Sequence, residues 1–149
     1  MSNQGAPRVP LPARVQGQPD DVAPDGSEIR LLIDGAPERG GATRASLCEV
    51  TLPAGQVSRP VWHRTVEEIW YVLAGHGDVW RCPPDARTEE VPPVPVGPGD
   101  ALVIPTGWRF QFCAGPGAPL RFLCYTSPPW PGADEARPAG AGGLGPATV

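Results

Sequence analysis

Residues 55–75, GQVSRPVWHRTVEEIWYVLAG, are the stretch of the chain that decides its fold. The stretch is bounded by Gly55 and Gly75, contains one of only two histidines, His63, and places Glu68 at the start of a dense apolar run. Because side chains alternate between the two faces of a β-strand, Val61 and His63 are expected to point the same way. The stretch therefore predicts two short strands that carry an imidazole and a carboxylate.

Outside this stretch, the composition is typical of a single globular domain. The chain has 149 residues, about 40% of them apolar, and a formal net charge of −4. Its 12 basic residues are all arginines and are not clustered, so we expect no nucleic-acid partner. No apolar run approaches the length of a membrane span, and the N-terminus lacks the pattern of a secretory signal. We therefore expect no membrane partner and a cytoplasmic location.

The four cysteines and the two ends of the chain carry no catalytic motif. Cys48, Cys82, Cys113 and Cys124 are dispersed and form no C-x-x-C pair, so they are interpreted as reduced, packed thiols. Residues 1–25 contain five prolines without apolar periodicity and are expected to form a flexible arm. Residues 131–149, rich in Pro, Gly and Ala, are expected to form a flexible tail. The predicted domain spans residues 26–130.

Within that domain, short apolar runs separated by Gly, Pro and Asp clusters predict an all-β fold. A β-hairpin is expected at Gly75-His76-Gly77, since glycine tolerates positive φ angles. Residues 83–99 hold six prolines and are not expected to form a central strand. No segment has a sustained helical period. Strands are expected at residues 28–33, 42–52, 60–63, 68–74, 78–82, 101–104, 110–114 and 120–126.

Two motifs in the chain resemble those of the cupin family. The first cupin motif, G-x5-H-x-H-x(3,4)-E-x6-G, aligns with Gly55, Val61, His63, Glu68 and Gly75. The second, G-x5-P-x-G-x2-H-x3-N, aligns with Gly99, Pro105, Gly107, Phe110 and Ala114. The resemblance implies a double-stranded β-helix, which is a jelly-roll barrel, with the site inside it.

The same alignment shows an incomplete set of metal ligands. Cupins with a full set bind a divalent metal through three histidines and a glutamate, whereas this chain has Val61 and Phe110 at two of those positions. A metal such as Zn, Mn, Fe or Ni would rest on His63 and Glu68. A third ligand could come from Cys113, Cys124 or Gln111 if the strand register shifts. The alternative is a pocket without metal.

Strand alternation also predicts the lining of the pocket. His63 and Glu68 are expected to lie among large apolar side chains, and Arg59 is expected near the mouth, where it could bind an anionic group. A histidine beside a carboxylate in an apolar cavity is a plausible acid and base pair. The alternative is that His63 is a hydrogen-bonded core histidine without a catalytic role. The expected lining residues are Val61, Trp70, Val72, Trp80, Phe110, Phe112 and Arg59.

Two classes of function remain open from the sequence. One is an enzyme of the isomerase, cyclase or lyase type that acts on a small organic molecule through His63 and Glu68, with a metal-dependent oxygenase or isomerase as a variant. The other is a non-catalytic module that binds a small ligand. The cupin resemblance also implies a homodimer, with residues 42–52 pairing across a two-fold axis.

Overall fold

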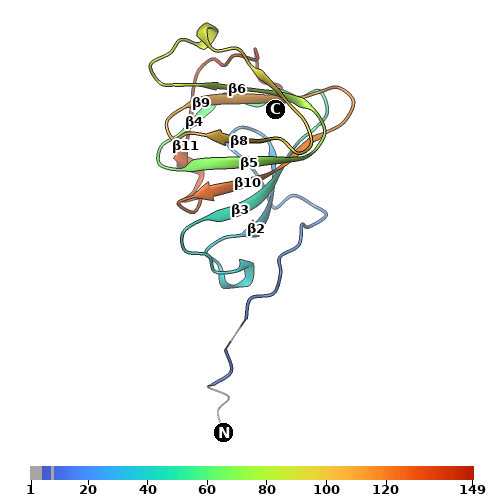
Figure 1. Cartoon of the computed structure of the whole chain (residues 1–149), viewed down its shortest axis with the longest axis vertical. Helices are drawn as coiled ribbons and strands as arrows, with labels where there is room; N and C mark the ends of the chain where they lie inside the picture. The colour runs from blue at the N-terminus through green and yellow to red at the C-terminus, as the bar shows by residue number, and fades with distance from the viewer. Residues whose placement is uncertain (1–4, 8) are drawn as a thin grey trace.

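Two antiparallel sheets lie against each other in the computed structural model, which describes residues 5–7 and 9–149 (Figure 1). The six-stranded sheet has the order β1 (Asp21–Val22), β2 (Glu28–Ile33), β3 (Ser46–Leu52), β10 (Leu120–Ser127), β5 (Glu67–Ala74), β8 (Ala101–Ile104). The five-stranded sheet has the order β11 (Ala136–Pro138), β4 (Val61–His63), β9 (Arg109–Ala114), β6 (Gly77–Cys82), β7 (Val94–Val96). Short 3-10 turns occur at Pro37–Arg39, Thr88–Glu90 and Ala133–Glu135.

The core between the sheets is aromatic. Trp70 stacks on Phe122 with ring centroids 4.0 Å apart, and Phe112 meets Trp70 edge-on at 5.1 Å. These rings are almost completely buried, and each comes from an inward-facing strand position. Aromatic contacts of this kind add to the free energy gained from burying the rings.

All eight strands expected from the sequence are present, with bounds that differ by at most a few residues. Three short strands, β1, β7 and β11, were not expected. β7 lies in the proline-rich segment and pairs only with β6 at a sheet edge, where a missing amide donor breaks no interior ladder. The jelly-roll expectation is therefore confirmed.

The expected hairpin at Gly75-His76-Gly77 is wrong. β5 pairs with β8 and β10, whereas β6 pairs with β7 and β9, so this connection carries the chain from one sheet to the other. Gly75 has a φ of 82°, and a Cβ there would collide with the carbonyl oxygen of Pro119. A Cβ on Gly77 would collide with the carbonyl oxygen of Cys113. Both glycines are needed because the backbone of the opposite strands comes so close.

The segment after residue 130 contributes to the second sheet. β11 pairs with β4, and the chain then crosses the outer face of β6 and β9. There Gln111 donates to the carbonyl oxygen of Gly145 at 2.7 Å and accepts from the amide of Leu144 at 2.8 Å. Gly143 lies against the indole of Trp80. The sheet therefore extends beyond residue 130; the mobility expected for either end stays a prediction.

The expected route to a dimer through residues 42–52 is not available in this topology. β3 pairs with β2 on one side and with β10 on the other, so its backbone has no free edge for a second chain. No helix in the described part of the chain is long and apolar enough to cross a membrane.

Candidate active site

A cavity of about 160 Å³ opens between the six-stranded sheet and β4. It is walled by β2, β3, β5 and β10, and its remaining sides are formed by the turn before β2 and by the segment after β10. Its lining is mainly apolar, which is the usual character of a small-molecule site. The polar side chains that line it include Asp25, Ser27, Ser46, His63, Glu68 and Thr126.

His63, at the end of β4, is 4% exposed and lies between two aromatic rings. Phe110 and Trp130 each meet the imidazole edge-on, with ring centroids 5.1 and 5.2 Å away. Nδ1 of His63 is buried and has no hydrogen-bond partner among the described residues. A buried polar atom without a partner is costly, so packing among the described residues does not by itself account for the position of His63.

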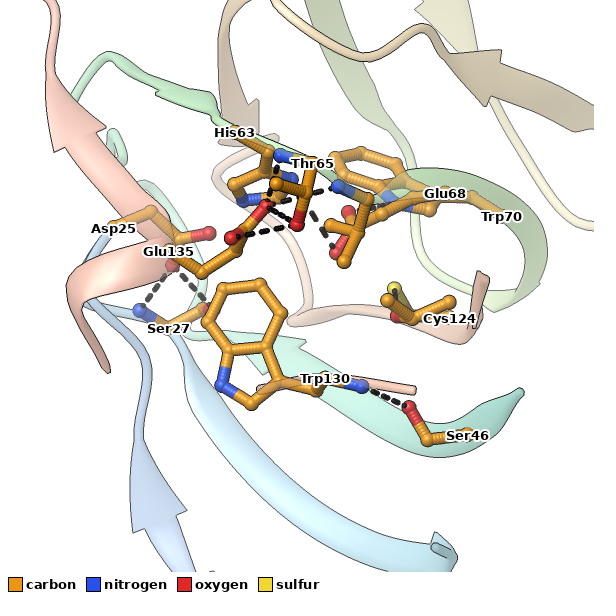
Figure 2. Close-up of polar contacts among 12 residues, drawn as sticks. Asp25, Ser27, Ser46, His63, Thr65, Glu68, Trp70, Cys124, Trp130 and Glu135 are labelled. Atoms are coloured by element: carbon orange, nitrogen blue, oxygen red, sulfur yellow. Dashed lines mark hydrogen bonds and ion pairs between the residues drawn. The ribbon is translucent and has the colours of Figure 1, made fainter. Parts of the chain in front are cut away.

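Glu68, on β5, directs its carboxyl group toward the same imidazole (Figure 2). Its Oε1 accepts a hydrogen bond from Nε1 of Trp70 at 2.9 Å. Its Oε2 lies 3.8 Å from Nδ1 of His63, which is too far for a hydrogen bond. The two groups therefore face each other across a gap without being bonded.

Burial shifts both pKa values toward the uncharged forms. Desolvation lowers the pKa of His63 to about 4, although the nearby charge of Glu135 acts in the opposite direction. Desolvation raises the pKa of Glu68 to about 7; the negative charge of Asp25 raises it further, whereas the Trp70 hydrogen bond lowers it. Near pH 6 the site therefore holds a neutral imidazole and a protonated carboxyl group. Shifts of this size are common at catalytic positions.

Glu135 fixes the loop between His63 and Glu68. Its carboxylate accepts hydrogen bonds from the backbone amides of Thr65 and Val66 and from the hydroxyl group of Thr65 (Figure 2). These bonds lower the pKa of Glu135 despite its burial, so it remains charged near neutral pH. The loop is thereby tied to the segment that leads into β11.

The predicted lining is partly wrong. Val61 and Trp70 line the cavity, as expected. Val72, Phe110 and Phe112 face inward but lie in the packed core, because the same strand faces form both the cavity wall and the core beside it.

Trp80 and Arg59 are also outside the cavity. Trp80 is on the outer face of its sheet, where the segment around Gly143 covers it. Nε of Arg59 donates to the carbonyl oxygen of Val149 at 2.9 Å. Trp80 was misplaced because β6 was expected to pair with β5, and that pairing does not exist.

Several cavity residues were not expected from the sequence. Asp25 and Ser27 come from the turn before β2, inside or beside the segment interpreted as an arm. Trp130 follows the last expected strand, and its ring contacts His63 and lines the cavity. A tryptophan that follows the last core strand was the only signal for it. The Pro-Asp-Gly-Ser turn around Asp25 contains no pattern that distinguishes a site from a surface turn.

The side chains do not fit the metal centre that the cupin resemblance implies. The described residues contain no group of three or more His, Cys, Asp or Glu side chains placed to hold a metal. Val61 and Phe110 are buried and offer no donor atom. Gln111 is engaged by the C-terminal segment and Cys113 faces Asp78, so neither supplies the third ligand. Cys124 lines the cavity near Glu68, but with His63 and Glu68 it does not form a group of described residues placed to hold a metal. We therefore derive no step through a metal.

Comparison with known proteins identifies the family. The cupin domain family matches residues 48–126, more than half of the chain. An uncharacterized protein of Methanocaldococcus jannaschii is 30% identical over 109 residues, which cover 73% of this chain and 79% of that protein. The chain belongs to the cupin family.

Two solved structures extend the comparison. The polyketide cyclase RemF from Streptomyces resistomycificus is 28% identical, with a TM-score of 0.62, and the match covers 91% of this chain and 87% of RemF. Pac13 of Streptomyces, described as a nucleoside dehydratase, has a TM-score of 0.57 over 85% of this chain and 84% of its own. Its identity of 12% supports the fold alone.

Proposed function

We propose that this cupin is an enzyme that moves protons on a small uncharged organic molecule, in an isomerisation, cyclisation or elimination. The observation that supports this most directly is the pairing of His63 and Glu68: both side chains line the cavity, and Nδ1 of His63, which has no partner among the described residues, lies 3.8 Å from Oε2 of Glu68. The apolar wall suits a substrate with an aromatic or aliphatic body.

The directions of the pKa shifts indicate which group is the base. A base must be unprotonated and an acid protonated at the working pH, and His63 with a pKa of about 4 and Glu68 with a pKa of about 7 satisfy this between those values. The reverse assignment, with a Glu68 carboxylate as the base, would operate only above the pKa of Glu68, about 7. His63 is therefore the base and Glu68 the acid.

The proposed step is an enolisation. The neutral imidazole of His63 removes a proton from a carbon next to a carbonyl group, and the C–H electron pair becomes the C=C bond of the enol. Glu68 transfers its proton to the carbonyl oxygen. Return of the proton to another carbon isomerises the substrate, attack of the enol on a second carbonyl closes a ring, and loss of a leaving group gives an elimination. Neutralising the developing oxyanion lowers the barrier most in a dry site.

The similarity to RemF supports this choice among cupin activities. RemF is named as a polyketide cyclase, and ring closure between carbonyl-bearing carbons requires the same removal of a proton next to a carbonyl. Pac13 shares only the fold, and its description as a dehydratase is compatible with acid and base chemistry in a barrel of this shape.

The test is deuterium incorporation next to the carbonyl of a panel of aryl ketones in D2O, followed by NMR. The wild-type protein should accelerate exchange, and His63→Ala and Glu68→Gln should each reduce the rate by about 100-fold or more, as expected for loss of a general acid or base. Full activity in both variants would show that the site is wrong. Ketones that bind without any exchange would instead favour a non-catalytic binding module.

We also propose a homodimer that forms through the outer face of the six-stranded sheet. Ile69, Tyr71 and Leu73 on β5 and Val103 on β8 are large apolar side chains exposed on this face. Tyr125 on β10 continues the patch. Contiguous exposed apolar surface is typical of protein interfaces.

A further inference from the structure

A second carboxyl group enters the cavity opposite Glu68. Asp25 lies in a tight turn between β1 and β2, closed by hydrogen bonds from the amide of Gly26 to Ala23 and from the amide of Ala23 to Ser27. Asp25 lines the same cavity as His63 and Glu68 but comes from a different wall.

One oxygen of this carboxyl group is held and the other is available. Oδ1 of Asp25 accepts hydrogen bonds from the amide of Ser27 at 2.9 Å and from its hydroxyl group at 2.6 Å (Figure 2). No described residue donates a hydrogen bond to Oδ2. A turn of this kind explains Oδ1 without any ligand. It does not explain why the carboxyl group is oriented beside a functional cavity with Oδ2 unused.

An independent observation indicates that a ligand belongs here. His63 lines the same cavity, its side chain is more than nine-tenths buried, and its Nδ1 has no partner among the described residues. The cavity thus presents the imidazole of His63, the free oxygen of Asp25 and the carboxyl group of Glu68. Three polar groups that converge in an apolar cavity set the orientation of a small molecule.

The charges of the lining exclude one class of ligand. Four of the lining residues carry carboxyl groups, Asp21, Asp25, Asp34 and Glu68, and none of the lining residues is an arginine. Arginine is the residue that binds carboxylates and phosphates in most proteins. An anionic substrate would lose its hydration in this mainly apolar cavity and would meet no arginine of the lining, whether or not the carboxyl groups are charged.

We propose that Asp25 is a second substrate-binding carboxyl group, which acts with Glu68 to hold two oxygen atoms of an uncharged dioxygenated substrate such as a β-dicarbonyl or a hydroxyaryl ketone. This proposal rests on the proposed function and specifies its substrate class. Each carboxyl group in its protonated form donates to one substrate oxygen, while His63 lies at the carbon between them. Burial raises the pKa of Asp25, although the Ser27 hydrogen bonds and Arg59 act against it, and this favours the donating form.

Binding of a matched pair of probes tests the proposal. Calorimetry at about pH 6 compares 2,4-dihydroxyacetophenone, which is uncharged, with 2,4-dihydroxybenzoate, which is an anion of nearly the same shape. Wild-type protein should bind the ketone at least about 30-fold more tightly, since the benzoate meets no cation. A wild-type protein that binds neither probe, or binds the benzoate as tightly, would overturn the substrate class.

Two substitutions at Asp25 distinguish a protonated carboxyl group, which donates a hydrogen bond to the ligand, from a carboxylate, which only accepts one. Asp25→Ala should weaken ketone binding about 10-fold, the usual effect of losing one buried hydrogen bond. Asp25→Asn keeps an N–H donor and an acceptor for Ser27, so its affinity should stay within about 3-fold of wild type. Equal losses in the two variants would mean that a carboxylate, not a protonated acid, meets the ligand, and would overturn the proposal.

Two further variants serve as controls. Asp21→Asn removes one negative charge at the cavity without touching the turn, and ketone affinity should not change. Ser27→Ala keeps the carboxyl group of Asp25 but removes the hydroxyl group that orients it, so ketone affinity should fall about 3-fold. This variant keeps the proposal testable if Asp25→Ala does not fold. Unchanged affinity in both Asp25→Ala and Ser27→Ala would overturn the role of Asp25. The exchange assay on His63 and Glu68 variants fails or succeeds independently of this result, because it measures turnover.

Discussion

At the scale of single residues, burial favours the uncharged form of both His63 and Glu68. In water, a histidine and a glutamate at neutral pH would form an ion pair or a simple hydrogen bond. Here desolvation acts on both, and a gap of 3.8 Å provides no bond to compensate for it. Between pH 4 and pH 7 both groups are therefore uncharged, which is the state that the proposed base and acid require.

The same burial predicts how a Glu68→Gln variant responds to pH. The folded pKa of Glu68, about 7, lies above its ordinary value of 4.5, so the wild-type protein loses stability as pH rises between these values. Glutamine has no proton to lose, and the His63 contribution is common to both proteins. Relative to wild type, the variant should gain about 3 kcal/mol in free energy of unfolding between pH 5 and pH 8. Urea denaturation at the two pH values measures this. If the free energies of unfolding of the variant and wild type differ by the same amount at pH 5 and pH 8, Glu68 is not a buried group that titrates in this range.

The sequence was sufficient to predict that His63 and Glu68 face the same interior space, but not which other residues line it. His63 and Glu68 lie in a motif with defined spacing, so their inward orientation followed from strand alternation. Phe110 was placed on the correct face but in the wrong region of the interior, because alternation does not separate a cavity wall from a packed core. Asp25 and Trp130 come from segments without periodicity, and only the folded chain brings them to the cavity.

At the scale of elements, short apolar runs bounded by Gly, Pro and Asp predicted the strands but not their partners. Eight segments were correct because each run is long enough for one strand and ends at residues that favour turns. Whether β5 and β6 pair depends on contacts that are distant in sequence, and two glycines around one residue are compatible with both a hairpin and a crossing between sheets. The second reading is correct because β9 and the segment before β10 pack against those glycines.

This crossing predicts a sharp difference between two glycine variants. Gly77→Ala introduces a Cβ into the carbonyl oxygen of Cys113, so the backbones of β6 and β9 must separate. A loss of about 2 to 4 kcal/mol in free energy of unfolding is expected, within the range for severe steric strain. Gly117→Ala, where a Cβ meets nothing within 4 Å, is the control and should change stability by less than about 0.5 kcal/mol. Similar stabilities for both variants would contradict the crossing.

At the scale of the whole molecule, both ends of the chain contribute to the site. Asp25 comes from before the first long strand, and Trp130 and Glu135 come from after the last. The C-terminal segment also covers Trp80 and Gln111 on the outer face of the second sheet. A chain reduced to residues 26–130 would therefore lose part of the cavity.

The exposed apolar face of the six-stranded sheet predicts a dimer that one charge disrupts. Light scattering after size exclusion should give twice the chain mass of 15.7 kDa for wild type. Tyr71→Glu, at a side chain 48% exposed on this face, should give the monomer. Val94→Glu, exposed on the other sheet, is the matched control and should remain dimeric. A monomeric wild type, or a dimer unaffected by Tyr71→Glu, would contradict this interface.

The central claim, that neutral His63 is the base and protonated Glu68 the acid, is tested most directly by the pH dependence of kcat/KM for proton exchange next to a ketone carbonyl. The predicted profile is bell-shaped, rising as His63 loses its proton near pH 4 and falling as Glu68 loses its proton near pH 7. Glu68→Gln should lower the rate and remove the fall near pH 7. A rate that increases through pH 7 and remains high in alkali would contradict the account, because Glu68 would then act as the base.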